Sequence, residues 1–283
     1  DTSYALSNVG RFRVSIFRQR GNIGLVMRVI PHYIGTFEEL NLPPVLGNIT
    51  KAPNGLILVC GPTGNGKSTT LASMIRYIND NFNYSVVTIE DPIEYIFHSN
   101  KSCIIQREVG IDTEGFGGAL KAAMRMDPDV IMVGEMRDLE TIDACIKAAE
   151  TGHLVLSTLH THNAASTISR IVGYFPPQAQ ESLRQRLAEI IVATVSMRLV
   201  RGKSGETVLP AMEVMYATAT IKACIRDGHL DELEQYIEKG RDEYNMQTLD
   251  QHLVQLCKKE IITLDEARRI SRTTDLERKL LYS

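Results

Sequence analysis

The sequence predicts an α/β fold in which a mostly parallel sheet is covered by helices on both faces. Short, almost continuously apolar runs indicate buried strands at residues 56–60, 86–89, 130–133 and 154–156. Between them lie stretches of helical character, at residues 67–79, 118–126 and 139–149. Strands and helices that alternate in this way along the chain are typical of parallel βαβ units.

The bulk composition is that of an ordinary globular protein. The chain has 283 residues, of which 43% are hydrophobic and 23% charged, which is ample for a buried core. Its net charge of −3 argues against nucleic acid as a partner of the whole chain. The five scattered cysteines favour reduced thiols in the cytoplasm over a disulfide framework or a zinc site. No apolar run reaches the roughly 18–20 residues of a membrane-spanning helix, and no signal peptide is recognisable.

The N-terminal part has a different pattern. Residues 11–17 alternate between polar and apolar, and residues 25–30 resume as a second strand, which predicts the end of a small antiparallel sheet. Because strand-like sequence begins so early, we expect the chain to be a fragment that lacks its native start. A linker that can hold a short helix is predicted over residues 42–54 by the turn-forming residues Pro43, Pro44, Gly47 and Pro53.

The C-terminal part is largely helical in pattern from residue 177. Residues 178–200 have apolar side chains at helical spacing and predict a helix, and residues 208–214 predict a short strand. Within residues 249–257, one apolar helical face is formed by Leu249, Leu253, Leu256 and Cys257. Thr263, followed by Glu266 three positions later, fits a capping box that begins another helix.

A glycine-rich run between the first buried strand and its helix matches the P-loop pattern G-x-x-x-x-G-K-[ST]. Its glycines allow backbone N–H groups to converge on phosphate oxygens at the start of a helix. Lys67 is expected to bridge the β- and γ-phosphates of ATP, and Ser68 to bind Mg²⁺. The predicted nucleotide-binding residues are Gly61, Pro62, Thr63, Gly64, Asn65, Gly66, Lys67, Ser68 and Thr69.

Acidic residues follow two of the predicted strands. Glu94 lies in an acidic turn after residues 86–89, where a carboxylate can orient the attacking water or hold Mg²⁺ through water. Residues 127–135 are similar to a Walker B strand, with Gly134 where an aspartate is usual. Glu135 or Glu94 must then supply the missing acid, so both are candidate catalytic and Mg²⁺-binding residues. A solvated acidic turn is the plainer alternative for the first turn, and a buried strand followed by an exposed glutamate for the second.

Two histidines bracket the predicted strand at residues 154–159. At roughly 3.3 Å per residue, His153 and His160 lie about 23 Å apart and cannot contact the same phosphate. His160, at the carboxyl end, is the better candidate for sensing the γ-phosphate, and His153 would serve elsewhere. An ordinary polar residue at a strand end is the alternative for both.

Five arginines and no acid occur in the first predicted strands: Arg11, Arg13, Arg18, Arg20 and Arg28. In ring ATPases, an arginine of one subunit can stabilise transition-state charge on a nucleotide held by its neighbour. Arg11 and Arg13 share one strand face. Arg11, Arg13 and Arg28 are therefore candidate catalytic residues, and a solvated basic edge strand is the alternative.

Taken together, these motifs resemble the secretion ATPase superfamily, and most closely its PilT branch, the type IV pilus retraction ATPases. The resemblance spans nearly the whole chain. It is most specific at residues 134–141 and 149–161, and it is also carried by residues 11–14, 61–70, 88–94, 106–109 and 246–250.

The resemblance implies a homohexamer of subunits with a small PAS-like N-terminal domain and a RecA-like ATPase domain. We therefore expect a partial PAS-like domain at residues 1–41, a hinge-forming linker at 42–54, a RecA-like P-loop NTPase core at 55–218 and a helical subdomain at 219–283. The resemblance also implies roles for matching residues. These are the Walker A pair Lys67 and Ser68, the catalytic Glu94, the Walker B Glu135 (for which Gly134 is normal), the histidines His153 and His160, and the arginines between Arg11 and Arg28.

The implied function is an ATP-hydrolysing hexameric motor that powers type IV pilus retraction and twitching motility. ATP and Mg²⁺ are the expected cofactors. The expected partners are further copies of the chain, an inner-membrane platform protein and a paralogous pilus ATPase, with no nucleic acid. The expected location is the cytoplasm, at the inner-membrane pilus machinery.

Four alternatives remain open. Residues 220–227 follow the branch's retraction motif only loosely, with Lys222 and Ala223 as departures, so a PilU-like accessory retraction ATPase is the first. An extension or secretion ATPase is the second, although such proteins usually carry four zinc-binding cysteines that this sequence lacks. A scaffold that binds ATP without hydrolysing it and a RecA-like nucleic-acid motor are the others.

Overall fold

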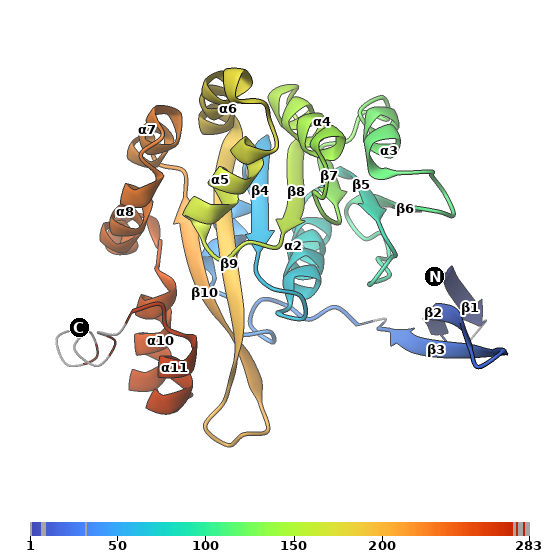
Figure 1. Cartoon of the computed structure of the whole chain (residues 1–283), viewed down its shortest axis with the longest axis horizontal. Coiled ribbons are helices and arrows are strands. Elements are labelled where there is room, and N and C mark those ends of the chain that lie inside the picture. The colour runs from blue at the N-terminus through green and yellow to red at the C-terminus, as the bar shows by residue number, and fades with distance from the viewer. Residues whose placement is uncertain (1, 7–9, 32, 274–275, 277–279, 281–283) are drawn as a thin grey trace.

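Two sheets of different size organise the chain (Figure 1). The structure, a computed structural model, describes residues 2–6, 10–31, 33–273, 276 and 280. The small sheet is antiparallel and has the order β1–β2–β3, formed by β1 (Thr2–Leu6), β2 (Gly10–Gln19) and β3 (Asn22–Ile30). It lies beside the β5–β6 end of the large sheet (Figure 1). The predicted end of a small antiparallel sheet is thus confirmed.

The large sheet has seven strands in the order β10–β9–β4–β8–β7–β5–β6. Every neighbouring pair is parallel except β9 with β10. The predicted α/β fold with a mostly parallel sheet is therefore confirmed. The strands are β4 (Gly55–Cys60), β5 (Ser85–Glu90), β6 (Cys103–Glu108), β7 (Val130–Val133), β8 (Leu154–Leu159), β9 (Ile191–Arg201) and β10 (Val208–Tyr216).

Helices cover both faces of this sheet because its central strands are apolar on both sides. On β4, Ile57 and Val59 pack toward α1 (Val45–Ile49) and α2 (Lys67–Asn81). Leu56 and Leu58 face the opposite layer. That layer contains α3 (Phe116–Ala123), α4 (Leu139–Glu150), α5 (Ala164–Gly173), α6 (Pro177–Ile190), α7 (Ala219–Asp227) and α8 (Leu233–Lys239). Among the described residues, no helix is both long and apolar enough to traverse a bilayer.

The prediction of one helix over residues 178–200 is wrong in its second half. Helix α6 ends at Ile190, and β9 begins at Ile191. The segment from Ile191 to Val200 is rich in β-branched residues, which favour strands. This segment is buried next to β4. A strand that is buried on both faces has apolar residues at most positions, and these include the positions expected for a helix. Strands β1 and β6 and helix α5 were not predicted.

The segment predicted as a linker is a packed part of the core. Leu46 and Ile49 of α1 are buried against α2, together with Phe37 and Leu42 just before them. The short helix expected here is present. Ile34 and Gly35 are buried as well, and the Gly35 carbonyl accepts from the Ser73 hydroxyl of α2 at 2.9 Å, so the packed segment begins at Ile34.

The last helices cover the exposed edge of β10. Backbone hydrogen bonds join Val214 to Gln247 in both directions, and the Met212 N–H donates to Nδ1 of His252 on α10 (Leu249–Lys258). These hydrogen bonds occupy backbone groups on the edge of β10 that could otherwise pair with a strand of another chain. The short segments η1 (Leu230–Glu232) and α9 (Arg241–Tyr244) lie between α7 and α10.

Helix α11 (Leu264–Ile270) begins at the predicted Thr263 cap, which accepts from the Glu266 N–H. The Glu266 carboxylate accepts from the Arg201 N–H on β9, so it fastens α11 to the sheet. The predicted helical region also includes residues 274, 275, 277–279 and 281–283, which lie outside the described residues.

Candidate nucleotide-binding site

The carboxyl ends of four parallel strands meet at one pocket. The P-loop follows β4, the acidic turn follows β5, Glu135 follows β7 and His160 follows β8. Ligands in open α/β sheets bind at this edge, where loops from neighbouring strands diverge. The pocket has a volume of about 840 Å³ and is lined by residues from all four loops and from the small sheet.

The P-loop adopts a backbone that its glycines permit. Gly66 has a φ of 85° and precedes the first turn of α2, whose residues Lys67, Ser68 and Thr69 line the pocket. Gly61 has a φ of 148°, and a Cβ there would lie 2.6 Å from the carbonyl oxygen of Met197. Asn65 anchors the loop to β9 by accepting from the Leu199 N–H at 2.9 Å.

Lys67 is folded back onto its own loop. Its Nζ donates to the carbonyls of Gly61 at 3.0 Å and Pro62 at 3.2 Å. Burial lowers the pKa of Lys67, while the carboxylates of Glu135 and Glu94 oppose this shift. A phosphate could replace these carbonyls as the acceptor, which is the chemistry expected of a P-loop lysine.

His160 joins the P-loop to Glu135. Its Nδ1 lies 3.4 Å from Nζ of Lys67 and 3.4 Å from Oγ1 of Thr63, and its Nε2 lies 3.3 Å from Oε2 of Glu135. The lysine can only donate, so the contacts fit a neutral imidazole that carries its proton on Nε2. His153 lies at the other end of β8, where Nδ1 contacts the Ala148 carbonyl at 2.9 Å. The structure thus separates the two histidines as predicted.

The acidic turn after β5 carries Glu94 into the pocket lining. Glu90, at the end of the strand, is buried and accepts from Thr88 and Gln106 at 2.7 and 3.0 Å. Burial raises the pKa of Glu90, and these hydrogen bonds counteract the rise. The hydroxyl of Tyr95 lies 2.8 Å from that of Thr69, which links the Glu94 turn to the first turn of α2.

Glu135 is held by an arginine as well as by His160. Arg137 forms ion pairs with Glu135 and, at 3.5 Å, with Asp91 of the acidic turn. At Gly134, the N–H donates to the Ile89 carbonyl, and the carbonyl accepts from Thr158 at 2.7 Å. The residue in the usual aspartate position is therefore a backbone link between β5, β7 and β8.

The small sheet contributes two arginines to the pocket. Arg13 and Arg28 stand opposite each other on β2 and β3, and both line the pocket of their own chain. Like charges opposite each other on one face repel, so an anion between them would be stabilising. These arginines were predicted to reach a neighbour's nucleotide; within the single chain they line their own pocket.

Arg11 does not line the pocket. Its Nη2 lies 2.6 Å from Oε2 of Glu108 on β6, whose side chain is 2% exposed. The same carboxylate oxygen accepts from the Ile93 N–H at 3.3 Å. The contact therefore ties the small sheet to the turn that carries Glu94.

Most of the predicted site residues line this pocket, namely Thr63, Gly64, Gly66, Lys67, Ser68, Thr69, Glu94, Glu135, His160, Arg13 and Arg28. Gly61, Pro62 and Asn65 instead shape the loop through the contacts described above. Three further residues line the pocket for which no role was predicted, namely Arg137, Tyr95 and Leu199. Arg137 could have been predicted from the sequence, because it lies two residues after Glu135. Leu199 lies on the strand mistaken for a helix, so no local signal pointed to it.

The oxygen atoms around the pocket fit a hard divalent cation. Ser68 offers a hydroxyl, and Glu94 and Glu135 offer carboxylates. Mg²⁺ at phosphate sites is typically held by one or two such groups together with phosphate oxygens and water. Within the described residues, no group of three or more histidine, cysteine, aspartate or glutamate side chains forms a metal cage.

The chain is similar to known proteins over most of its length. A family model described as type II/IV secretion system protein matches residues 9–276. The type IV pilus retraction ATPase PilT of Pseudomonas aeruginosa is 45% identical over 95% of this chain and 77% of its own length. The type IV pilus ATPase PilU of the same organism is 42% identical over 94% of this chain and 70% of its own.

A solved structure agrees with these sequence matches. The crystal structure of the pilus retraction motor PilT with bound ADP superposes with a TM-score of 0.92, at 46% identity, over 98% of this chain and 79% of that one. The family model spans β2 and β3 of the small sheet, the pocket residues and the helices up to α11. The chain therefore belongs to the type II/IV secretion system protein family.

Proposed function

We propose that this chain is an ATP-hydrolysing motor that powers the retraction of type IV pili. The observation that carries the proposal is the pocket itself, which unites the P-loop, Glu94, Glu135 and His160 with two arginines of the small sheet. The likeness to PilT over 95% of the chain supports pilus retraction as the work performed.

The pocket residues divide the chemistry of hydrolysis among them. Lys67 exchanges its carbonyl acceptors for the β- and γ-phosphates, and the P-loop N–H groups bind the phosphate oxygens. Glu94 orients the attacking water and accepts its proton. Glu135 accepts from Nε2 and orients His160, and Nδ1 must carry a proton to donate to the γ-phosphate once Lys67 has turned to the phosphates. Mg²⁺ held by Ser68, Glu94 and Glu135 would neutralise phosphate charge.

The arginines make hydrolysis depend on the position of the small sheet. Arg13 and Arg28 act on the nucleotide bound by their own chain, because they already line its pocket. Binding of ATP between the sheets draws them together, and loss of the γ-phosphate releases them. The hinge lies before Ile34, since Ile34 and Gly35 are held by α2 and the 42–54 segment is packed into the core.

The larger assembly follows from the same proposal. The small sheet is a partial PAS-like domain that ends before residue 34 rather than at 41. Residues 55–218 are a RecA-like core on which the preceding segment packs, and α7 to α11 form a helical subdomain. Six copies form a ring in the cytoplasm at the inner membrane, where they act on a pilus platform protein and alongside a paralogous pilus ATPase. The ring uses no nucleic acid. The machinery named for the PilT and PilU relatives supports this location.

Steady-state ATPase activity tests the site. Wild type, Glu94→Gln, Arg13→Ala and the control Arg18→Ala are compared at increasing protein concentration, with the affinity for ADP measured by calorimetry. Arg18 is exposed on the same strand as Arg13 and does not line the pocket. We expect Glu94→Gln to lower kcat by about 10²–10⁴-fold with ADP affinity retained. Arg18→Ala stays at the wild-type rate.

We expect Arg13→Ala to be inactive as well, and mixing it with Glu94→Gln separates the two arrangements of the arginines. If Arg13 acts on its own chain's nucleotide, a mixture of Glu94→Gln and Arg13→Ala stays inactive. Restored activity would place the arginine across a subunit boundary. A wild-type chain that binds ADP but does not hydrolyse ATP at any concentration would favour the scaffold alternative, and stimulation by DNA would favour the nucleic-acid motor.

Twitching assays test the biological role. In a bacterium that lacks its retraction ATPase, the wild-type chain should restore twitching and Glu94→Gln should not. Restoration only in the presence of a second pilus ATPase would favour the PilU-like accessory role. That alternative has its own support, since PilU is 42% identical to this chain.

A further inference from the structure

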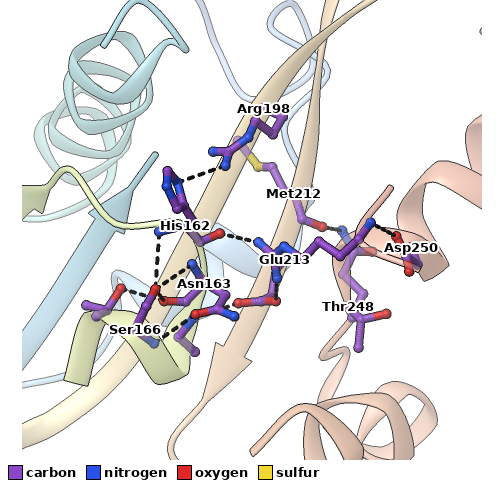
Figure 2. Close-up of polar contacts among 12 residues, drawn as sticks. His162, Asn163, Ser166, Arg198, Met212, Glu213, Thr248 and Asp250 are labelled. Carbon is purple, nitrogen blue, oxygen red and sulfur yellow. Dashed lines mark hydrogen bonds and ion pairs between the residues drawn. The ribbon is translucent and has the colours of Figure 1, made fainter. Parts of the chain in front are cut away.

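An ion pair between a buried carboxylate and a partly exposed arginine lies outside the pocket, where no step of hydrolysis uses it. Glu213 of β10 is 2% exposed, and its Oε2 lies 2.6 Å from Nη1 of Arg272, which follows α11. Burial raises the pKa of Glu213, and the charge of Arg272 opposes the rise. Figure 2 shows Glu213 between His162 and Asn163 on one side and Asp250 on the other.

The pair holds the turn between β8 and α5 at two points. Nη2 of Arg272 donates to the carbonyl of His162. The second carboxylate oxygen of Glu213, Oε1, accepts from the Ala164 N–H at 2.7 Å, at the first residue of α5. Arg272 therefore connects β10 and the 162–164 turn at one fixed separation, because its planar guanidinium places the two donors rigidly.

This turn leads directly into the pocket. His160 lies two residues before His162 and contacts Lys67 and Glu135. The His162 side chain is held from β9, where Nη2 of Arg198 lies 3.0 Å from its Nδ1. A shift of the His162 backbone is thus passed to His160 over two peptide units, while the α5 end of the turn is fixed by the Asn163 cap.

The C-terminal helices determine where Arg272 sits. Oδ1 of Asp250, a buried residue in the first turn of α10, accepts from the Ser271 hydroxyl at 2.9 Å and from the Arg272 N–H at 3.3 Å. Movement of α10 relative to β10 would therefore move Arg272. The contacts thus run from Asp250 on α10 through Arg272 to the His162 carbonyl, in the turn that follows His160.

Stability alone does not account for this arrangement. Burying a carboxylate such as Glu213 costs free energy that its attraction to a partner largely offsets, and well-packed apolar residues often stabilise a fold equally well. A guanidinium shared between a carboxylate and a carbonyl on separate elements instead specifies their relative position. We propose that Arg272 is a positioning residue of the ATPase site, seated on Glu213, through which the C-terminal helices set the position of His160.

The inference rests on the proposed ATP hydrolysis, and its test has a readout that does not. Arg272→Ala, Arg272→Lys and Glu213→Gln are compared with Arg268→Ala, an exposed arginine of α11. We expect Arg272→Ala to lower kcat by about 10- to 100-fold with little change in ADP affinity, because the P-loop is intact. Arg272→Lys keeps the positive charge but not the planar pair of donors, so its kcat should lie between those of Arg272→Ala and wild type. Arg268→Ala should match wild type.

Hydrogen exchange detected by mass spectrometry reports the coupling directly. In Arg272→Ala and Glu213→Gln, peptides that cover residues 160–166 should exchange faster, while peptides of the P-loop keep their protection. Faster exchange confined to residues 249–273 would mean that Arg272 only holds the C-terminal helices, and would overturn the proposal. This measurement stands even if the chain proves not to hydrolyse ATP.

A double-variant cycle tests whether Arg272 acts through His160. In a His160→Gln background, Arg272→Ala should cause little further loss of kcat, because the group that it positions is already gone. The same fold-loss in both backgrounds would show an independent effect and overturn the proposal. If Arg272→Ala does not fold, Glu213→Gln, which keeps the shape of the side chain, replaces it in the cycle.

Discussion

Arg11 and Glu108 are 97 residues apart in the chain, yet Nη2 of the arginine lies 2.6 Å from Oε2 of the glutamate. The contact joins β2 of the small sheet to β6 of the large one. It distinguishes Arg11 from Arg13, which lies on the same strand face and lines the pocket. Two arginines with similar sequence context therefore differ in their contacts. Arg13 lines the candidate nucleotide-binding pocket, and Arg11 attaches the small sheet to β6.

Loss of either partner should loosen the small sheet. Arg11→Ala leaves the Glu108 carboxylate buried without this ion pair, so we expect the free energy of unfolding to fall by about 1–3 kcal/mol. Urea denaturation followed by circular dichroism measures the change. The double variant Arg11→Ala, Glu108→Gln should be less destabilised than the sum of the single variants. Additive losses would show that the two residues act independently.

Replacement of His160 should separate binding from turnover. Its contacts reach Lys67 and Glu135 but not the backbone of the P-loop, so His160→Gln should leave ADP affinity within a few-fold of wild type. We expect kcat to fall by about 10²-fold or more. His153→Gln is the matched control, because His153 lies at the far end of β8. Equal loss in both variants would show that the histidines support the strand rather than the reaction.

Acid should destabilise the C-terminal helices through His252. Burial, and then the charge of Lys259, lower the pKa of His252 to about 4, below its usual 6.5. Between these two pKa values, His252 is protonated in the unfolded chain but not in the folded one. The free energy of unfolding is therefore unaffected by His252 above about pH 6.5 and falls as the pH drops toward 4. The free energy of unfolding should fall by about 1–3 kcal/mol over this pH range.

The variant His252→Gln tests this origin, because an amide can still accept from the Met212 N–H but does not titrate. Urea denaturation between pH 4 and 7 should give a smaller change in stability for the variant than for wild type. An unchanged slope would assign the acid sensitivity to other groups.

Two glycine replacements should shift stability in opposite directions. Gly61→Ala places a Cβ 2.6 Å from the Met197 carbonyl at a φ of 148°, so we expect a loss of about 1–3 kcal/mol and weaker ADP binding. Gly118→Ala adds a methyl group to α3, where no atom lies within 4 Å, and should stabilise by about 0.5–1 kcal/mol. Thermal unfolding compares both with wild type. A destabilised Gly118→Ala would contradict the helix-propensity argument.

Much of the architecture was predictable because its signals are local. Apolar runs with intervening helical stretches predicted β4, β5, β7 and β8 and the helices between them, since burial on both faces requires apolar residues at every position. The P-loop was predictable because its glycines meet conformational needs within eight residues. Strand β9 was not, because its apolar spacing fits a helix as well as a strand until its place beside β4 is known.

The sequence by itself determined the fold class, the P-loop and the set of residues that could act on a phosphate. Only the tertiary structure decided which of them meet. Strand order placed Arg13 in the pocket and Arg11 on Glu108, and it brought Arg272 to a turn more than a hundred residues earlier in the chain. The physical reason is that spacing reports on the conformation of neighbouring residues, whereas contacts across the chain depend on how separate elements pack.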